Sequence, residues 1–501
     1  MYRKCKRDKP KEKTMKDSNI VNKEKKQFKF SAKYIVWLIA IVFLVTAIVV
    51  LTKVVKMGVL PTGYVAAAIA VLAVILILDI IGARKVWSGV ITSIISIVLI
   101  AAMIIGVIAI NKVDQTVDIV TDKGTEEKTE MVVAVLADSD VEKITDLKEL
   151  LIGYLNDYDA EASQKVMDEI DDSVGGTANY NAFDDKFAMV DALYNQTIKA
   201  MIFNKANIEV IKDAEGYEDF EDKVKIIYSS ELVKYIEIVD KTDSNLDQFV
   251  VYVSGIDTFG DVSVRSRSDV NILAVVNTKT KHIQLINTPR DYYIEHPQSN
   301  GVKDKLTHAG LYGVENSIGA LESLYGINID YYVRMNFSGF ENIIDAMGGI
   351  DVYSDKDFTV EPVKHYTVGV NHLSGIEALA FARERHAFAA GDIQRGQNQM
   401  NVIIAMINKL SSKDVLYNYS EVLDGIAGTF QTDMTSDDIY TLVKRQLVDN
   451  TKYTIDSYSV TGNGDSCTTY STPKTKVWVM QPNMDEVENA KKLINNVLNE
   501  K

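Results

Sequence analysis

The chain has 501 residues, of which 47% are hydrophobic and 25% are charged, and its formal net charge is −15. This length and hydrophobic content allow two or three folded domains and exclude a chain that is disordered throughout. The acidic balance argues against a protein that binds anions through its overall field, so any anion site must be a local cluster of arginines.

Three long apolar segments lie near the N-terminus, at residues 34–52, 60–81 and 86–110. Each is long enough to cross a hydrocarbon core of about 30 Å. Because the segments contain almost no polar residues at helical spacing, they predict three membrane-spanning helices within residues 34–110. They do not fit buried helices of a soluble core.

The distribution of basic residues predicts how these helices are oriented. Residues 1–33 form a basic tail, and Arg84 and Lys85 lie in the turn between the second and third spans. The positive-inside rule therefore places the N-terminus in the cytoplasm and everything after the third span outside the cell membrane. The first span is full length and has no small-residue cleavage pattern, so a cleavable signal peptide is not expected. This topology separates Cys5 from Cys467 and excludes a disulfide between them.

The polar residues 111–129 predict a linker, and residues 130–241 predict a small extracellular α/β accessory domain. Its expected strands are residues 131–137, 199–203 and 224–228, and its expected helices are residues 147–154 and 187–196. The accessory domain contains no catalytic motif. Its acidic group could bind calcium, but without EF-hand spacing it is interpreted as a solvated helix face. The group comprises Asp168, Glu169, Asp171 and Asp172.

Residues 242–501 predict a second extracellular domain with clearer alternation of strands and helices. Strands are expected at residues 249–255, 270–277, 282–287 and 331–335, and amphipathic helices at residues 315–325 and 339–347. Strands that alternate with amphipathic helices predict an α/β/α sandwich with a central mixed sheet and with ligands near the strand ends.

Two aspartates lie at the ends of the first two predicted strands of this domain. Asp257 follows one strand and Asp269 precedes the next. If the strands are adjacent, as sequential strands usually are, the two carboxylates meet at one edge of the sheet. One or two carboxylates, completed by water and phosphate oxygens, suit Mg²⁺ or Mn²⁺. The spacing alone is equally compatible with ordinary turn or cap aspartates.

Four arginines follow in the same domain. Arg290 comes directly after a proline at the exit of a predicted strand, Arg383 and Arg385 are separated by one residue, and Arg395 lies ten residues further on. Guanidinium groups suit phosphate oxygens because their planar donors bind in pairs and stay charged. A lone arginine is usually a surface ion-pair partner, whereas four in this arrangement predict an anion site. The sequence has no serine-hydrolase, zinc-protease, Cys-x-x-Cys or Walker motif.

Residues 248–410 resemble the catalytic domain of the LytR-CpsA-Psr family, whose members attach glycopolymers to the cell wall of Gram-positive bacteria. The resemblance rests on Gly-Ile-Asp at 255–257, Arg-Ser-Asp at 267–269, Pro-Arg-Asp at 289–291, Lys-Leu-Thr-His-Ala at 305–309, Gly-Gly-Ile-Asp-Val at 348–352, His-Leu-Ser-Gly at 372–375, Arg-x-Arg at 383–385 and Gly-Asp-x-x-Arg-x-x-x-Gln at 391–399. The C-terminal stretch also resembles the last strand and helix of the family. Three spans and an accessory domain before the catalytic domain resemble the capsule-associated CpsA branch.

The resemblance implies a magnesium and pyrophosphate site with a role for each matching residue. Asp257 and Asp269 would hold Mg²⁺ or Mn²⁺ and, with Arg290, form the catalytic group. The pyrophosphate of an undecaprenyl-linked polysaccharide, expected to be capsular, would be bound by Arg290, Arg383, Arg385 and Arg395. Lys305, Gln399 and Asp392 would bind or brace the same group. The lipid tail would enter an apolar pocket, and the acceptor would be a hydroxyl of peptidoglycan at the outer face of the membrane.

Two other functions stay open. The first is an extracellular protein that binds or senses a wall fragment or solute, and the second is a polyprenyl-pyrophosphate phosphatase that uses water as the acceptor in the same site. A nucleic-acid partner is not expected, because a domain outside the membrane cannot contact DNA and the short basic tail has no recognition helix.

Overall fold

The computed structural model describes residues 32–501 except 59, 61, 83, 85, 124–125, 237–245, 390, 413–427 and 450. The chain divides into two compact units, one made of Met1–Val49 with Ala67–Ile104 and the other of Val50–Ala66 with Ile105–Lys501. The predictions that concern the basic tail, Cys5 and Lys85 fall outside the described residues. Cys467 is free and partly exposed.

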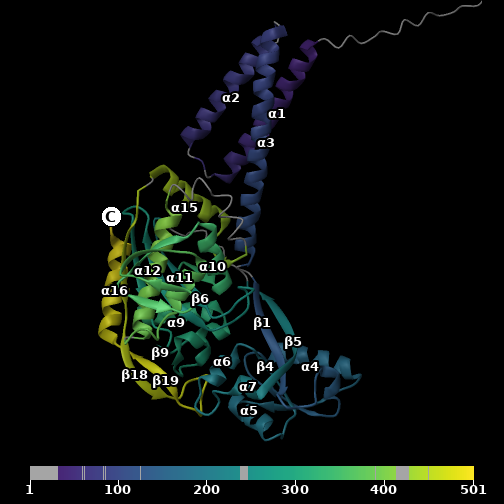
Figure 1. The fold of residues 1–501 in the computed structure, drawn as a ribbon, viewed down its shortest axis with the longest axis vertical. Helices are drawn as coiled ribbons and strands as arrows, with labels where there is room; N and C mark the ends of the chain where they lie inside the picture. Colours follow the sequence, from purple (N-terminus) through teal and green to yellow (C-terminus); the bar gives the residue numbers. More distant parts are fainter. Residues whose placement is uncertain are drawn as a thin grey trace, which may run out of the picture. The chain divides into compact units, whose positions relative to one another are not determined.

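Three long apolar helices form the N-terminal part: α1 (Ala32–Met57), α2 (Thr62–Gly82) and α3 (Val86–Lys123). Each contains a stretch that is long and apolar enough to cross a membrane. The three predicted spans are thus confirmed as helices that suit membrane anchoring, while their orientation stays a prediction. Helix α3 continues to Lys123, so most of the predicted linker is helical (Figure 1).

A five-stranded mixed sheet forms the accessory domain (Figure 1). In the order β3-β2-β4-β1-β5, its strands are β3 (Asn179–Phe183), β2 (Leu151–Leu155), β4 (Ala200–Asn204), β1 (Glu126–Leu136) and β5 (Val224–Tyr235). Strand β2 is parallel to β3 and β4, whereas β1 is antiparallel to β4 and β5. Helix α4 (Ala160–Val174) covers one face. The other face is covered by α5 (Lys186–Tyr194), α6 (Asn207–Lys212) and α7 (Phe220–Lys223).

The prediction of a helix at residues 147–154 is wrong. Ile144–Leu147 forms a short 3-10 helix, and Leu151–Leu155 is β2, which lies between β3 and β4. Ile152 is buried against α4 and Leu155 against α5 and α6, on opposite faces of the sheet. A strand buried on both faces has a continuous apolar run, which periodicity cannot distinguish from a helical segment.

The other predicted elements of the accessory domain are confirmed as β1, β4, β5 and α5. The acidic group of residues 168–172 lies on α4, where Glu169 accepts hydrogen bonds from Tyr228 and Ser230 and Asp171 accepts one from Tyr180. Among the described residues, no group of three or more His, Cys, Asp or Glu could hold a metal ion. The acidic residues of α4 are therefore partly structural.

The second domain is built on a six-stranded mixed sheet. In the order β16-β11-β6-β7-β8-β17, its strands are β16 (Phe430–Thr432), β11 (Tyr331–Met335), β6 (Gln248–Ile256), β7 (Ser268–Asn277), β8 (His282–Asn287) and β17 (Thr454–Ser459). Strand β7 is antiparallel to β6 and β8, β11 is parallel to β6, and β17 is parallel to β8. The four predicted strands and the predicted adjacency of the first two are confirmed.

Helices cover both faces of this sheet, so the predicted α/β/α sandwich is confirmed. On one face, Tyr252 and Leu273 pack against α9 (Val314–Tyr325) and α16 (Met484–Asn499). On the other face, Val251 and Ile272 pack against α12 (Asp392–Leu410) and α15 (Ser436–Asp449). Neighbouring residues of one strand enter different layers because side chains alternate across a sheet.

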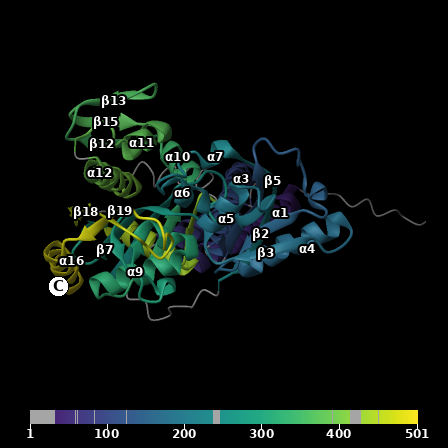
Figure 2. The same ribbon diagram turned by 90° about the horizontal axis from the view of Figure 1, so that it is seen from below.

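A smaller lobe with its own core follows β11 and ends at Arg383, the first of three predicted arginines in this part of the chain. It contains α10 (Phe337–Ala346), β12 (Ile350–Ser354), β13 (Phe358–Val360), β14 (Lys364–Tyr366), β15 (Gly369–Leu373) and α11 (Gly375–Arg383). Figure 2 shows these strands grouped with α11 and α12. The remaining elements are β9 (Tyr293–Ile294), β10 (Asp304–Lys305), α8 (Leu306–Ala309), β18 (Gly462–Cys467), β19 (Val477–Pro482) and the 3-10 turns Pro297–Ser299 and Gly310–Tyr312.

Candidate functional site

One cavity of about 680 Å³ lies where β6 and β11 end and β7 begins. It brings together seven of the predicted site residues, namely Asp257, Asp269, Arg290, Arg383, Arg385, Arg395 and Gln399. The rest of its wall is largely apolar and includes Val253, Val270, Phe337, Phe340, Leu379 and Ile403. The cavity therefore joins a group of charged side chains to an apolar interior, at the strand ends where ligands bind in sheets of this kind.

The pairing of β6 with β7 brings Asp257 and Asp269 to the same edge of the sheet. The two strands pair from Gln248 with Asn277 to Ile256 with Ser268. They approach so closely before Asp257 that a Cβ on Gly255 would lie 2.8 Å from the side chain of Val270. The register of one hairpin thus positions both carboxylates.

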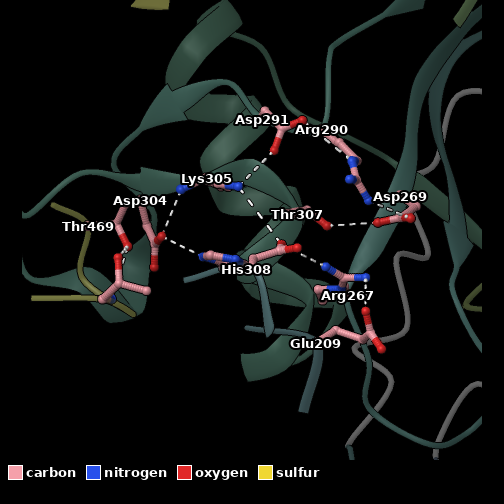
Figure 3. Close-up of polar contacts among 12 residues, drawn as sticks. Glu209, Arg267, Asp269, Arg290, Asp291, Asp304, Lys305, Thr307, His308 and Thr469 are labelled. Carbon is pink, nitrogen blue, oxygen red and sulfur yellow. Dashed lines mark hydrogen bonds and ion pairs between the residues drawn. The ribbon is translucent and has the colours of Figure 1, made fainter. Parts of the chain in front are cut away.

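The carboxylate of Asp269 is held by two donors (Figure 3). It accepts hydrogen bonds from Nη1 of Arg290 at 2.9 Å and from Oγ1 of Thr307 at 3.0 Å. Burial alone would raise the pKa of Asp269, but Arg290, Arg267 and Arg395 together hold this pKa below its usual value. Asp269 is consequently an ionised carboxylate at neutral pH.

Arg290 is presented by the turn that leaves β8. The backbone carbonyl of Arg290 accepts a hydrogen bond from the amide of Thr307 at 2.8 Å, which ties this turn to α8. Burial would lower the pKa of the guanidinium, but Asp269 and Asp291 raise it above its ordinary value. Among the described residues, only Nη1 of this guanidinium makes a hydrogen bond, and the buried Nε makes none. Arg290 is therefore permanently charged and keeps donors for an anion.

Asp257 pairs with a different arginine, because Nη2 of Arg267 lies 3.1 Å from its Oδ2. Two carboxylates in one cavity fit a magnesium site that completes its shell with water and phosphate oxygens. The described residues contain no group of three or more candidate metal ligands. Such an ion would therefore take its further ligands from water and from the substrate.

Each of the other three predicted arginines contacts a side chain that holds it in place. Helix α11 starts with a capping box between Ser374 and Glu377 and ends at Arg383, whose guanidinium lies 4.3 Å from the ring centroid of Phe337. Asp392, in the first turn of α12, lies 3.3 Å from Arg395 and 3.8 Å from Arg385. Asp392 thus contacts two of the arginines, and its bracing role stays a prediction.

Burial lowers the pKa of Arg395, and repulsion from Arg290 lowers it further. Two positive charges that line the same cavity therefore repel one another, and an anion bound beside both would relieve this repulsion. His386 also lines this cavity, and its Nε2 accepts a hydrogen bond from Nε of Arg385 at 3.4 Å.

Lys305 does not line the cavity. Its buried Nζ lies 3.2 Å from Asp291 and 4.0 Å from Asp213, and Asp291 in turn lies 3.4 Å from Nε of Arg290. Lys305 thus lies behind the turn that presents Arg290, which it reaches through Asp291. Its contact with pyrophosphate and its bracing role both stay predictions.

Several residues of the site had no predicted role. Arg267, Asp291 and Thr307 lie inside the quoted motifs, so the motifs could have identified them. Glu209 and Asp213 come from the accessory domain and also line the cavity. No local signal marks these two carboxylates, because the hydrogen bond from Arg267 to Asp213 spans 54 residues.

Known proteins similar to this chain identify its family. The model of the LytR_cpsA_psr family matches residues 211–493, which is more than half of the chain. A polyisoprenyl-teichoic acid–peptidoglycan teichoic acid transferase TagU from Bacillus cereus is 34% identical over 195 residues, covering 39% of this chain and 63% of the relative. The enzyme of the same name from Bacillus anthracis is 33% identical over 213 residues, covering 41% and 69%.

The chain thus spans just under two thirds of the first of these relatives. A crystal structure of TagV from B. subtilis is 25% identical, covers 52% of this chain and 100% of its own, and has a TM-score of 0.43. The family model covers the whole predicted motif core, residues 248–410. The chain belongs to the LytR-CpsA-Psr family.

Proposed function

We propose that the chain transfers a glycopolymer from a polyisoprenyl pyrophosphate carrier to peptidoglycan at the outer face of the membrane. The observation that carries this proposal is the single cavity that joins arginines to an apolar interior. A lipid pyrophosphate has the matching division into an anionic and an apolar part. The names of the TagU relatives describe a transfer of this kind for those proteins.

The arginines support the chemistry of pyrophosphate cleavage. When a sugar hydroxyl attacks the carrier pyrophosphate, a bond to the leaving phosphate breaks and negative charge develops on that phosphate. Preplaced guanidinium groups stabilise the charge where it develops, and Arg290 and Arg395 already face the same cavity. Mg²⁺ held by Asp257 and Asp269 would supply a Lewis acid at the same place.

The acceptor hydroxyl must lose a proton during the transfer. Asp269 is a poor base, because three arginines hold its pKa below the usual value and two donors occupy its oxygens. Asp257 shares the cavity and has one arginine partner, Arg267. We therefore assign the general-base role to Asp257.

The apolar wall suits the lipid chain, which we expect to be undecaprenyl. A cavity of about 680 Å³ falls within the range of small-molecule sites. Membrane anchoring through α1, α2 and α3 would keep the enzyme beside both the lipid carrier and the cell wall, which lowers the entropic cost of the encounter. Three spans and an accessory domain favour capsular polysaccharide as the glycopolymer.

The decisive experiment measures polysaccharide covalently bound to purified peptidoglycan. Cells would carry the wild type, Arg290→Ala or Asp257→Ala as their only ligase of this family, with Arg445→Ala as a matched control. Arg445 lies in α15 and does not line the cavity. Loss of attached polymer in the two site variants, with normal membrane levels of protein and a normal control, is the expected result.

Unchanged attachment in both site variants would contradict the proposal and favour a binding or sensing protein. The phosphatase alternative is separated by a second readout on the purified protein. Formation of polyisoprenyl monophosphate from the lipid carrier should depend on an added peptidoglycan acceptor. Equal formation of the monophosphate without any acceptor would favour hydrolysis.

A further inference from the structure

The accessory domain contributes two carboxylates to the charged end of the cavity. We call Glu209 and Asp213 the accessory carboxylates; Glu209 lies on α6 and Asp213 caps its C-terminus. Both reach Arg267 (Figure 3 labels Glu209 and Arg267). Nη1 of Arg267 lies 3.1 Å from Asp213, and Nη2 lies 3.7 Å from Glu209.

Arg267 is therefore shared between the two domains. Nη2 also lies 3.1 Å from Asp257, the predicted metal ligand and proposed base. The Arg267 side chain is only 6% exposed, so its buried positive charge is stabilised by these carboxylates and not by water. The N–H groups of Arg267 are shared among three carboxylates. The more of them that bind Asp257, the less available Asp257 is to bind a metal ion or to accept a proton.

Asp213 contacts a second buried cation of the catalytic domain. It lies 4.0 Å from Nζ of Lys305, whose nearer partner Asp291 also contacts Arg290. Two further ion pairs join the domains nearby, between Lys128 and Asp261 and between Arg265 and Asp159. The accessory domain is thus joined to the catalytic domain by ion pairs from β1, from the start of α4 and from α6.

We propose that the accessory carboxylates are positioning residues of the pyrophosphate site, through which the accessory domain sets the charge of the cavity and the availability of Asp257. The inference rests on the proposed function. With both carboxylates present, Arg267 is partly neutralised and only part of it engages Asp257. Without them, Arg267 turns its donors to Asp257, and the cavity becomes more positive. Binding of a divalent cation then weakens, and binding of pyrophosphate strengthens.

The test measures these two affinities separately on the purified full-length chain in detergent. Asp213→Asn and Glu209→Gln remove one charge each, and Asp222→Asn is the matched control on α7, where the side chain is exposed. Calorimetry would follow Mn²⁺ alone and then inorganic pyrophosphate alone. For Asp213→Asn, we expect Mn²⁺ affinity to fall by at least about threefold and pyrophosphate affinity to rise by a similar factor, as a unit charge removed within several ångströms requires. Asp213→Glu keeps the negative charge, so its affinities for Mn²⁺ and for pyrophosphate should stay close to those of the wild type.

The opposite signs distinguish positioning from general damage. A merely structural role would weaken both affinities in parallel, and this result would overturn the inference. Unchanged affinities in both accessory variants would overturn it as well. If the wild type binds neither Mn²⁺ nor pyrophosphate, the proposed function itself fails, and the inference fails with it.

Discussion

Replacing Arg290 by alanine should destabilise the fold as well as remove a ligand of the anion. Arg290 and Asp269 form a 2.9 Å hydrogen-bonded ion pair in which the side chains are 14% and 19% exposed. A hydrogen bond to a charged group contributes about 1.5–3 kcal/mol. Breaking a buried pair by removing one partner costs about 3–5 kcal/mol when the remaining charge is left uncompensated.

For Arg290→Ala we expect the smaller cost, about 1.5–3 kcal/mol, because Asp269 keeps other partners. Arg267 and Arg395 still stabilise its negative charge, and Thr307 still donates to it. We therefore expect a loss of about 2 kcal/mol at pH 7, measured as the free energy of unfolding in urea. Arg290→Lys should recover part of this loss, since it keeps the charge without the planar pair of donors.

The pH dependence gives this prediction a definite sign. The pKa of Asp269 is lowered in the folded protein, so the stability it contributes is present above its unfolded value of about 4 and is lost as the pH falls through the folded value. Without Arg290, the pKa of Asp269 in the folded protein is lowered less. The stability difference between wild type and Arg290→Ala should be full at pH 7 and should narrow below about pH 4. A difference that is constant from pH 7 to pH 3 would refute the assigned pairing.

Three further outcomes follow from the described contacts. Leu321→Ala should cost about 2–5 kcal/mol in urea unfolding, because this side chain is fully buried between α9 and the sheet; a loss below about 1 kcal/mol would contradict the packing. Ala380→Trp should fill the apolar part of the cavity and abolish polymer attachment while pyrophosphate binding persists; full attachment would exclude this wall as the lipid site. Chelation with EDTA should stop transfer by the purified protein, and Mg²⁺ should restore it; transfer that persists in EDTA would exclude the metal.

The core elements and the strand-end aspartates could be predicted because their signals are local. Short apolar runs marked β6 to β8, and the short connection between β6 and β7 made their pairing the natural expectation. Once these strands are adjacent, Asp257 and Asp269 must lie at one edge.

Other features could not be read from the sequence because they depend on distant partners. The apolar run around Leu151 reads equally as a helix or as a central strand, and only the neighbours β3 and β4 decide between them. The position of Lys305 behind Arg290 depends on Asp291 and on Asp213 of another domain. The same holds for Glu209, whose partner Arg267 lies across the domain boundary.

An acidic protein can hold an anion site because the positive charges of this cavity have local partners. Arg290 contacts Asp269 and Asp291, and Arg267 contacts Asp257, Asp213 and Glu209. Asp392 contacts both Arg385 and Arg395, while Arg383 lies on the ring of Phe337. Pairing makes burial of the guanidinium groups tolerable and fixes their directions before a substrate arrives, so that an anion meets donors that need not reorganise. Because its charges are paired, such a site attracts a distant anion only weakly. The net charge of −15 weakens this attraction further. Under the proposed function this costs little, since a lipid-linked substrate and a membrane-anchored enzyme already share one surface and do not depend on electrostatic steering to meet.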